Sequence, residues 1–227
     1  MGFHQLHGTG KCAQYEPSEK VGLQRYGLSS LQGIPGLWKM DHSHNGSGDC
    51  GGCNKEVSRN IRYQNLTIRD SIPEDAWQLA AWWNDGAVMA HAGFPLGLGI
   101  TEEKVIAGLG NGRLTLEENS RLIGEACYRQ VGDGIAEIGI KICETDCQNR
   151  GLGRIILSML ISWLFENGFR KIVLDTNLNN LRAQHVYESL GFRKLRVNYD
   201  AWTDQLGQKQ SSVDYELTEN DFIDYRK

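Results

Sequence analysis

The stretch that decides the fold is Gln148-Asn-Arg-Gly-Leu-Gly-Arg154, which lies between a strand-like run and the most apolar helix-like run of the chain. Its glycines at 151 and 153 let the backbone pass close to a ligand, and the first N–H groups of the following helix have no partner inside that helix. Such N–H groups can bind a pyrophosphate, and Arg150 and Arg154 would add positive charge. Considered alone, however, a short glycine motif is as often an ordinary surface turn.

The runs around this stretch predict a buried helix on an antiparallel meander. Apolar residues recur at helical spacing over 151–168, which is typical of a largely buried helix. Upstream, short turns separate three strand-like runs at 113–117, 121–130 and 135–143. In the last run, isoleucines alternate with other residues, so one face belongs to the core and the other, which carries Glu137, is open to a substrate.

Patterns elsewhere complete an α/β (α+β) chain. A short strand is predicted at 66–69, and Ser71-Ile-Pro-Glu74 is typical of a capping box that opens a helix ending near Trp83. Asn84-Asp-Gly86 interrupts that helix. Further helices are expected at 101–109 and 180–190, and further strands at 171–176, 192–202 and 212–217. We therefore expect residues 61–227 to form a mixed, mostly antiparallel central sheet flanked by helices.

Two segments together resemble the GCN5-related N-acetyltransferase (GNAT) family. Motif A of that family is Gln or Arg, two residues, Gly, one residue, then Gly or Ala, and Gln148, Gly151 and Gly153 fill these positions. Downstream, Asn180-Leu-Arg-Ala-Gln-His-Val-Tyr-Glu-Ser-Leu-Gly-Phe192 is similar to the family segment Asn-x-x-Ala-x-x-x-Tyr-Glu-x-x-Gly-Phe. Two matched motifs at the usual distance are much more specific than either alone.

The resemblance also indicates a branch and a reaction. Ala81-Trp-Trp-Asn-Asp85 and Ala136-Glu-Ile-Gly-Ile140 are similar to the branch that acetylates ribosomal-protein N-termini and related amines, and the likeness extends over roughly residues 61–222. It implies a GNAT-type fold in which a primary amine, at a protein N-terminus or on a small molecule, directly attacks acetyl-CoA in a ternary complex. The implied cofactor contacts are Ile140, Lys141, Ile142, Gln148, Asn149, Arg150, Gly151, Leu152, Gly153, Arg154 and Asn180.

This reaction requires an acid and a base. An amine with a pKa of about 10 is mostly protonated at neutral pH, so a base or a water relay must take its proton. Glu137 is the favoured base, while Asp175 occupies a position where some members of the family carry a basic carboxylate; either could instead be structural. The resemblance assigns Tyr187 as the acid that protonates the CoA thiolate, although its ring could simply complete an apolar face. Asn180 could cap its helix as well as bind CoA.

Residues 1–60 lack the apolar periodicity of a core, and we expect a poorly structured or metal-stapled extension. His42, His44, Cys50 and Cys53 lie within 12 residues, and Cys-x-x-Cys is a recurrent half of a zinc site. A structural zinc is therefore one hypothesis for this extension. A plain tail and a redox-active cysteine pair are the alternatives.

Composition limits the partners. The formal net charge of −4 does not favour a nucleic-acid partner, which would need clustered basic residues. The first 30 residues contain no continuous apolar run, so we expect no secretory signal, no membrane partner and a cytoplasmic location with free or metal-bound cysteines. Acetyl-CoA and an amine acceptor are the expected partners, and a homodimer is possible.

A rival interpretation is a non-enzymatic module that senses CoA or a metal on the same fold. Tyr187, two candidate carboxylates and a complete motif A favour an enzyme, since a binding module needs neither acid nor base. Dinucleotide binding by a Rossmann unit is disfavoured, because the glycine turn follows an antiparallel meander rather than opening a parallel unit.

Overall fold

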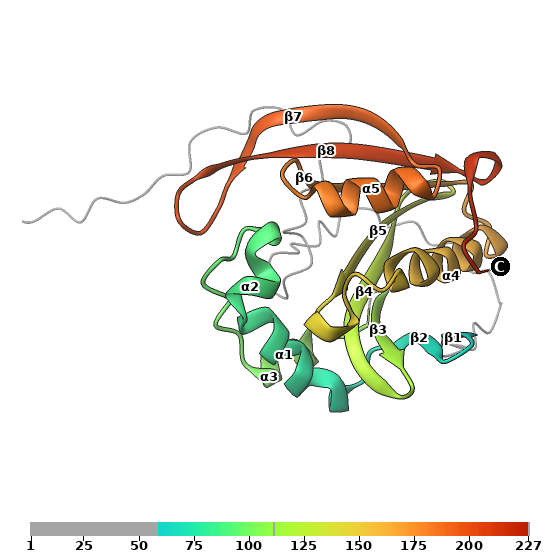
Figure 1. Cartoon of the computed structure of the whole chain (residues 1–227). Coiled ribbons are helices and arrows are strands. Elements are labelled where there is room, and N and C mark those ends of the chain that lie inside the picture. The colour runs from blue at the N-terminus through green and yellow to red at the C-terminus, as the bar shows by residue number, and fades with distance from the viewer. Residues whose placement is uncertain (1–58, 111, 227) are drawn as a thin grey trace, which may run out of the picture.

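In the computed structural model, residues 59–110 and 112–226 are described and form one central sheet (Figure 1). The strands are β1 Asn60–Tyr63, β2 Leu66–Asp70, β3 Arg113–Glu118, β4 Arg121–Gly132, β5 Ile135–Ile142, β6 Lys171–Asn177, β7 Arg193–Thr203 and β8 Lys209–Thr218. Their order across the sheet is β1-β2-β3-β4-β5-β6-β8-β7, and every neighbouring pair is antiparallel except β5 and β6. The expected mixed, mostly antiparallel sheet is confirmed.

Helices cover both faces of this sheet. They are α1 Ala76–Asn84, α2 Gly86–Met89, α3 Glu102–Ala107, α4 Leu152–Glu166 and α5 Leu181–Ser189, with 3₁₀ turns η2 Pro73–Asp75, η3 Ala90–Ala92, η4 Thr145–Cys147 and η5 Glu219–Asp221. α4 and α5 pack on the core face. On the other face, Trp83 of α1 bonds Glu125 and Met89 of α2 contacts Lys141. Within 59–110 and 112–226, no helix combines the length and apolarity needed to cross a membrane.

The helix α4 lies at the centre of the core because apolar residues occupy most of its surface. Its most buried apolar side chains, each at most 1% exposed, are Ile156, Leu157, Met159, Leu160, Ile161 and Leu164. They pack in one cluster with Ile138 of β5, Ile172 of β6 and Tyr187 of α5. This burial fixes the start of α4 relative to the ends of β5 and β6, where the functional residues lie.

The pairing of β5 with β6 stops halfway, and this split positions the site. Ile135–Glu137 on β5 pair with Lys171–Val173 on β6, but β5 continues to Ile142 and β6 to Asn177. Among the described residues, no strand pairs with the facing edges beyond that point, so these edges can accept another extended chain. α4 follows the end of β5 and α5 follows the end of β6, so both helix N-termini flank the open end of the split.

The capping box expected at Ser71–Glu74 is wrong. The Ser71 hydroxyl lies 2.8 Å from Thr115 Oγ1, and the backbone N–H of Ile72 instead donates a 3.0 Å hydrogen bond to the Asp75 carboxylate. Asp75 is held there by Arg69, whose Nη1 is 2.7 Å from its Oδ2. Asp75, held by its ion pair with Arg69, therefore accepts the hydrogen bond at the start of the helical segment, and Ser71 does not act as its cap. The helix α1 begins at Ala76.

Two short elements had no clear signal in the sequence. β1 has the weakly alternating sequence Asn-Ile-Arg-Tyr and pairs with β2 through a turn in which Gln64 has φ of 52°. Asn84 ends α1 as expected, but the chain then forms α2, because Asp85 Oδ1 accepts a 2.7 Å hydrogen bond from Ala87 N–H. A Cβ at Gly86 would lie 2.0 Å from the Pro95 carbonyl oxygen, so only glycine fits this close approach.

Candidate active site

The motif-A turn, residues 148–154, lies at the end of the split. Gln148 Nε2 donates a 2.9 Å hydrogen bond to the Ile142 carbonyl, which holds the turn against the last residue of β5. Gly151 has φ of 81°, in the left-handed region that favours glycine, and α4 begins at the next residue. The N-terminus of this 15-residue helix therefore opens beside the end of β5, with its first N–H groups available to an anion.

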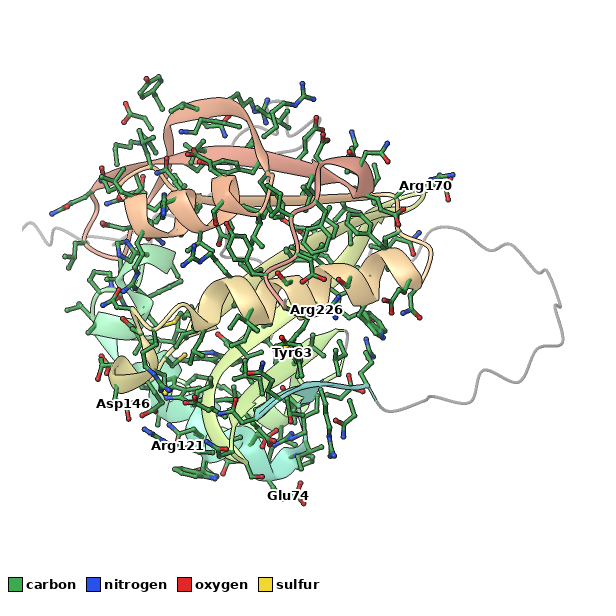
Figure 2. The ribbon with its side chains drawn as sticks, turned by 45° about the vertical axis from the view of Figure 1, so that its right-hand side comes forward. Tyr63, Glu74, Arg121, Asp146, Arg170 and Arg226 are labelled. Atoms are coloured by element: carbon green, nitrogen blue, oxygen red, sulfur yellow. The ribbon has the colours of Figure 1, made fainter. Side chains whose placement is uncertain are left out.

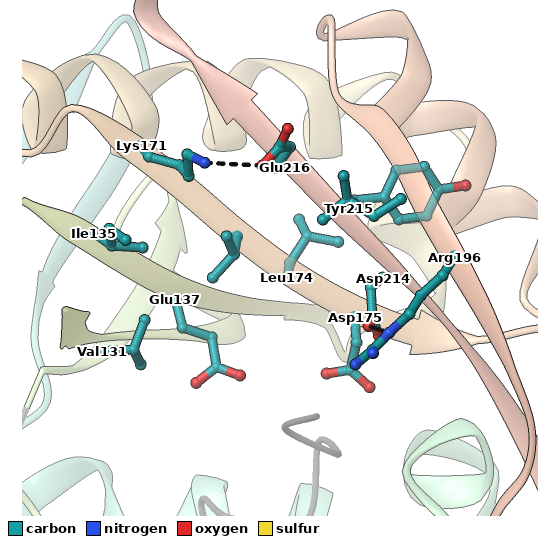
Figure 3. Close-up of a pocket in the computed structure, with 12 residues that line it drawn as sticks. Val131, Ile135, Glu137, Lys171, Leu174, Asp175, Arg196, Asp214, Tyr215 and Glu216 are labelled. Atoms are coloured by element: carbon teal, nitrogen blue, oxygen red, sulfur yellow. Dashed lines mark hydrogen bonds and ion pairs between the residues drawn. The ribbon is translucent and has the colours of Figure 1, made fainter. Parts of the chain in front are cut away.

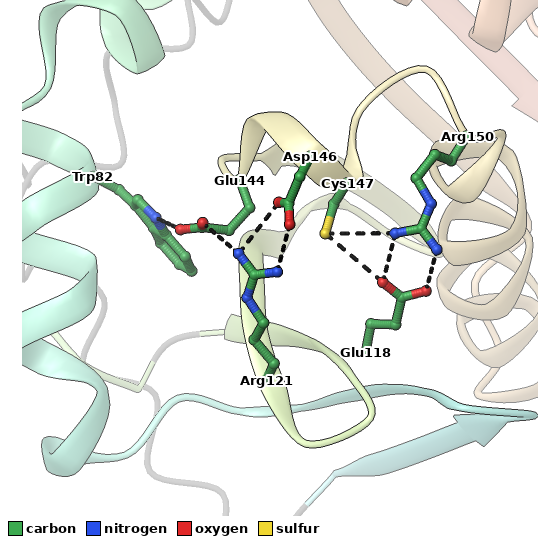
Figure 4. A network of polar contacts seen from close by, with 7 residues as sticks. All are labelled: Trp82, Glu118, Arg121, Glu144, Asp146, Cys147 and Arg150. Atoms are coloured by element: carbon green, nitrogen blue, oxygen red, sulfur yellow. Dashed lines mark hydrogen bonds and ion pairs between the residues drawn. The ribbon is translucent and has the colours of Figure 1, made fainter.

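The two arginines of this turn have different partners. Both Nη atoms of Arg150 bond the Glu118 carboxylate, at 2.9 and 2.8 Å (Figure 4). The guanidinium of Arg154 lies over the ring of Tyr225, 4.9 Å from its centroid. Because Glu118 already balances the charge of Arg150, the geometry favours Arg154 as a cation for a phosphate.

A third cation beside the turn was not identified in the sequence analysis. Arg182, exposed on the first turn of α5, places Nη1 3.0 Å from Gln148 Oε1 and 3.5 Å from Asn149 Oδ1. These partners are neutral amides, so they do not cancel its charge. The available signal was its place in the second motif, two residues after Asn180.

Two acidic side chains just ahead of the turn share ion pairs with Arg121 (Figure 4). Its guanidinium lies 2.8 Å from Glu144 Oε2 and 2.6 Å from Asp146 Oδ2. Trp82 Nε1 donates a 2.8 Å hydrogen bond to Glu144 Oε1, which ties η4 to α1. This network fixes the segment that leads into the turn and offsets negative charge that would repel an anionic cofactor.

Tyr187 is a buried phenol with no hydrogen-bond partner among the residues that the structure describes. Its ring packs against Phe192 and Tyr215, with centroids 5.8 Å away in both cases. Burial raises the pKa of Tyr187, and the nearby Asp175 and Cys127 raise it further. The hydroxyl therefore keeps its proton at neutral pH and can donate it to a ligand.

Glu137 and Asp175 direct their carboxylates into the same region (Figure 3). Glu137 forms an ion pair with Arg129 on β4. Burial raises the pKa of Glu137, and Arg129 opposes that shift. Burial raises the pKa of Asp175 to about 8, and the negative charges of Glu137 and Asp214 contribute to the rise. Asp175 therefore changes protonation near pH 8.

A cavity of about 280 Å³ adjoins these carboxylates. Its apolar lining comes from Val131, Ile135, Val173, Leu174, Leu195 and Tyr215, and its charged lining from Glu137, Lys171, Asp175, Arg196, Asp214 and Glu216. Lys171 and Glu216 pair at 3.0 Å, and Arg196 and Asp214 pair at 2.7 Å. Glu137 pairs with Arg129, so Asp175 is the acidic group of this lining for which no ion pair is found among the described residues.

The β7–β8 hairpin is joined to the loop 93–97, and we call this connection the bridge. Gln205, between β7 and β8, accepts a 2.9 Å hydrogen bond from Leu96 N–H and donates one of 2.9 Å to the Gly97 carbonyl. The Trp202 ring packs so closely on Gly93 that a Cβ there would lie 2.3 Å from it. The loop 93–97, which follows α2 and η3, is thereby joined to the β7–β8 hairpin (Figure 1).

Further contacts connect this bridge to both sides of the split. On β6, Asn177 bonds Gln210 at 3.0 Å, and Gln210 bonds Asp204 of the hairpin at 2.8 Å. On β5, Lys141 Nζ lies 3.1 Å from Met89 Sδ of α2. A substrate that enters the split on the side of α2 must therefore pass between strands β5 and β6 and the joined β7–β8 hairpin and loop 93–97.

The remaining candidates have the following positions. Asn180 caps α5, since its Oδ1 accepts a 3.2 Å hydrogen bond from Ala183 N–H. The backbone of Ile140, Lys141 and Ile142 lies in the unpaired part of β5. His42, His44, Cys50 and Cys53 lie outside the described residues, as does most of the expected extension 1–60. Within the described residues, no group of three or more His, Cys, Asp or Glu side chains is arranged to hold a metal ion.

The fold and motif-A turn agree with a match to the Acetyltransferase (GNAT) family over residues 59–192, which is more than half of the chain, and the chain belongs to this family. Among its relatives is the [ribosomal protein bS18]-alanine N-acetyltransferase of Escherichia coli, 34% identical over 91 residues, or 39% of this chain and 61% of that protein. An uncharacterized protein of Methanocaldococcus jannaschii is 33% identical over 85 residues, which span 37% of this chain and 18% of the relative.

A solved structure shows the same architecture. The spermidine N-acetyltransferase of Vibrio cholerae, in complex with CoA and spermine, superposes with a TM-score of 0.62 at 19% identity. The superposition covers 69% of this chain and 97% of that one. At this identity, the likeness shows the fold and not the substrate.

Proposed function

We propose that this chain transfers an acetyl group from acetyl-CoA to a primary amine by direct attack in a ternary complex. The observation that carries the proposal is the β5–β6 split, which has the motif-A turn at its open end and an acid and two carboxylates beside it. When bound, acetyl-CoA supplies an activated acyl thioester. Every other requirement of the reaction falls to side chains and backbone of this chain.

The site fits the cofactor. The helix N-terminus behind Gly151 provides N–H donors for the pyrophosphate, and Arg154 and Arg182 provide charge. A Cβ at Gly153 would meet Ile142 Cδ1 only at 3.9 Å, so the approach to the backbone here is open. The unpaired edge of β5 at 140–142 supplies the backbone groups for the pantetheine arm and for the carbonyl oxygen that gains negative charge.

Tyr187 is the proposed acid. Its hydroxyl must give a proton to the thiolate that leaves, and the phenol is neutral, buried and without an internal acceptor among the described residues. Tyr187 is 7% exposed, and its hydroxyl is not among the fully buried polar atoms without a partner in the described residues. A ligand in the split can therefore reach this hydroxyl and accept its hydrogen bond.

Asp175 is the proposed base, in preference to Glu137, which the sequence favoured. A base takes a proton from an ammonium group more readily when its own pKa is closer to that of the amine. Asp175, with a pKa of about 8, meets this condition, whereas Glu137 is held by Arg129. Glu137 then acts on the base, because its negative charge contributes to the raised pKa of Asp175.

The acceptor is proposed to arrive as a cation. Asp175 lines the cavity without an ion-pair partner in the part of the chain that the structure describes and has a pKa of about 8, so its ionised form offers a negative charge to an ammonium group. Names of related proteins point to two kinds of acceptor, a ribosomal-protein N-terminus and the polyamine spermidine. Both are linear chains that end in an amine, and both fit a site bridged by the β7–β8 hairpin.

Several expectations outside the site remain proposals. A cytoplasmic location agrees with the free thiols of Cys127, Cys143 and Cys147. The boundary between an extension 1–60 and a catalytic domain 61–227, the zinc at His42, His44, Cys50 and Cys53, and a homodimer stay predictions. Elemental analysis of protein purified without a histidine tag, with Cys50→Ser/Cys53→Ser as the control, measures the zinc.

An acetyl-CoA consumption assay tests the function. The unaltered chain is assayed with peptides that begin in different residues, with polyamines and with small amines, and the acetylated product is identified by mass spectrometry. Tyr187→Phe is the matched control, since it removes one hydroxyl. A chain that binds acetyl-CoA but acetylates no amine in the panel would favour the alternative, a non-enzymatic CoA-responsive module.

A further inference from the structure

The segment that follows β8 crosses α4, and Figure 2 shows Arg226 beside this helix and close to Tyr63. The Tyr225 N–H donates a 3.0 Å hydrogen bond to Ser158 Oγ, and Arg226 Nη2 donates one of 2.6 Å to Ser162 Oγ. The Tyr63 hydroxyl of β1 donates to the carbonyl oxygen of Arg226. Residues 222–226 are thus tied to successive turns of α4 and to the first strand.

This attachment brings the Tyr225 ring against Arg154. Arg154 and Ser158 are four residues apart and share one face of α4, so a segment bonded to Ser158 reaches the arginine. The guanidinium carbon lies 4.9 Å from the ring centroid, within the range of a cation–π contact. Arg154 Nη2 would be 3.9 Å from a Cβ built on Gly151, so the guanidinium lies over the first turn of the helix.

The kind of contact matters for what Arg154 can bind. Near the same turn, Arg150 is bonded to Glu118 and Arg121 to Asp146, so those donors are occupied. Arg154 contacts the ring of Tyr225, and no carboxylate of the described residues lies within ion-pair distance of it. An aromatic face restrains a guanidinium without accepting its in-plane N–H bonds, so these donors remain available to an anion.

We propose that Tyr225 is a positioning residue for the phosphate groups of acetyl-CoA, because its ring holds the Arg154 guanidinium at the motif-A turn. The proposal rests on the proposed acetyl-CoA site and adds the segment 222–226 to it. Arg154 supplies the charge and the hydrogen-bond donors. Tyr225 reduces the conformational freedom that the long side chain would otherwise lose on binding.

A double-mutant cycle in the full chain tests the proposal. Dissociation constants for CoA and for dephospho-CoA, which lacks the 3′-phosphate, are measured calorimetrically for the unaltered chain, Arg154→Gln, Tyr225→Leu and the double variant. We expect CoA to bind about tenfold more weakly to Arg154→Gln and about threefold to fivefold more weakly to Tyr225→Leu. The double variant should bind like Arg154→Gln alone, because the ring acts only through the arginine.

Two further variants separate positioning from general loss of structure. Tyr225→Phe keeps the ring and should bind CoA within about twofold of the unaltered chain. Ile223→Ala changes an exposed side chain of the same segment, 52% accessible, and should leave binding unchanged. Melting temperatures without ligand show whether Tyr225→Leu loosens the protein as a whole.

The binding measurements either support or overturn the role of Tyr225. Equal losses for CoA and dephospho-CoA assign Arg154 to the pyrophosphate, and a loss confined to CoA assigns it to the 3′-phosphate; both support the proposal. Additive effects in the cycle, or unchanged affinity in Tyr225→Leu while Arg154→Gln binds weakly, would overturn it and leave the cofactor site intact. Absence of CoA binding by the unaltered chain would overturn the proposed function together with this proposal.

Discussion

The two sides of the β5–β6 split are built in different ways. On the cofactor side, local contacts set the backbone of the turn: Gln148 reaches the Ile142 carbonyl six residues away, and Gly151 sets the backbone for the helix that follows it. The arginines of this turn, in contrast, are held by distant residues, since Glu118 bonds Arg150 and Tyr225 packs on Arg154. On the acceptor side, contacts are distant: Gln205 reaches Leu96, 109 residues away. The backbone of the motif-A turn therefore depends mainly on its own segment, whereas the position of its arginines and the whole acceptor side depend on the complete tertiary structure.

The largest effect should come from Gly151→Val, which alters the cofactor side of the split. Valine disfavours the φ of 81° found at this position, and its side chain would project where the helix N-terminus must meet the phosphates. We expect no measurable acetyl-CoA binding by calorimetry. Gly168→Val is the matched control, because Gly168 also has a positive φ, of 89°, with no atom near its added Cβ, but ends α4 instead of opening it. Equal loss in both variants would attribute the effect to backbone strain alone.

Removal of the base should have the next largest effect. For Asp175→Asn we expect about a 100-fold loss of turnover at pH 7 with the best amine of the panel. Asp175 acts when ionised, so the activity of the unaltered chain should rise with pH, reach half of its maximum near 8, the pKa of this group, and level off above it. The Asn variant depends on amine that is already neutral, so its activity should keep rising toward the pKa of the amine, about 10.

Glu137→Gln distinguishes the two carboxylates in the same assay. Loss of its negative charge lowers the pKa of Asp175, so the plateau should move to lower pH with a smaller loss of turnover. A large loss in Glu137→Gln, with a profile that keeps rising toward the pKa of the amine, about 10, would return the role of base to Glu137.

Tyr187→Phe should reduce turnover about 10- to 100-fold and leave acetyl-CoA affinity nearly unchanged, because an acid acts on the transition state. The ring contacts with Phe192 and Tyr215 are retained in this variant. Single-turnover kinetics establish that chemistry limits the rate. Unchanged turnover under that condition would make Tyr187 a core residue.

The smallest effect should be seen at the bridge on the acceptor side. Gln205→Ala removes two hydrogen bonds to the loop 93–97, and we expect KM for the amine to rise about threefold to tenfold with KM for acetyl-CoA unchanged. Gln208→Ala, an exposed glutamine of the same hairpin, serves as the control. Equal changes in both KM values would show that the two sides of the split are not independent.

The difference between local and long-range contacts also explains which parts of the fold and of the site could be predicted from the sequence. The motif-A turn, the buried helix α4 and the meander from β3 to β5 follow from local spacing and were predicted close to their observed bounds. The partners of Arg150 and Arg154 could not be predicted, since Glu118 and Tyr225 lie 32 and 71 residues away and only the fold brings them near. The capping box failed for a related reason, because Arg69 and Thr115 claim the side chains of Asp75 and Ser71.

The strand order has a consequence for how the molecule folds. β8 lies between β6 and β7 although it follows both in the sequence, so β7 joins the sheet only through β8. Until β8 has formed, β6 presents an unpaired edge and the hairpin that carries Gln205 does not exist. Such non-local pairing slows folding, and the intermediate that precedes it exposes an edge prone to aggregation. A nascent chain that ends before residue 209 should therefore need a chaperone, even though residues 148–154 of its motif-A turn are already synthesised.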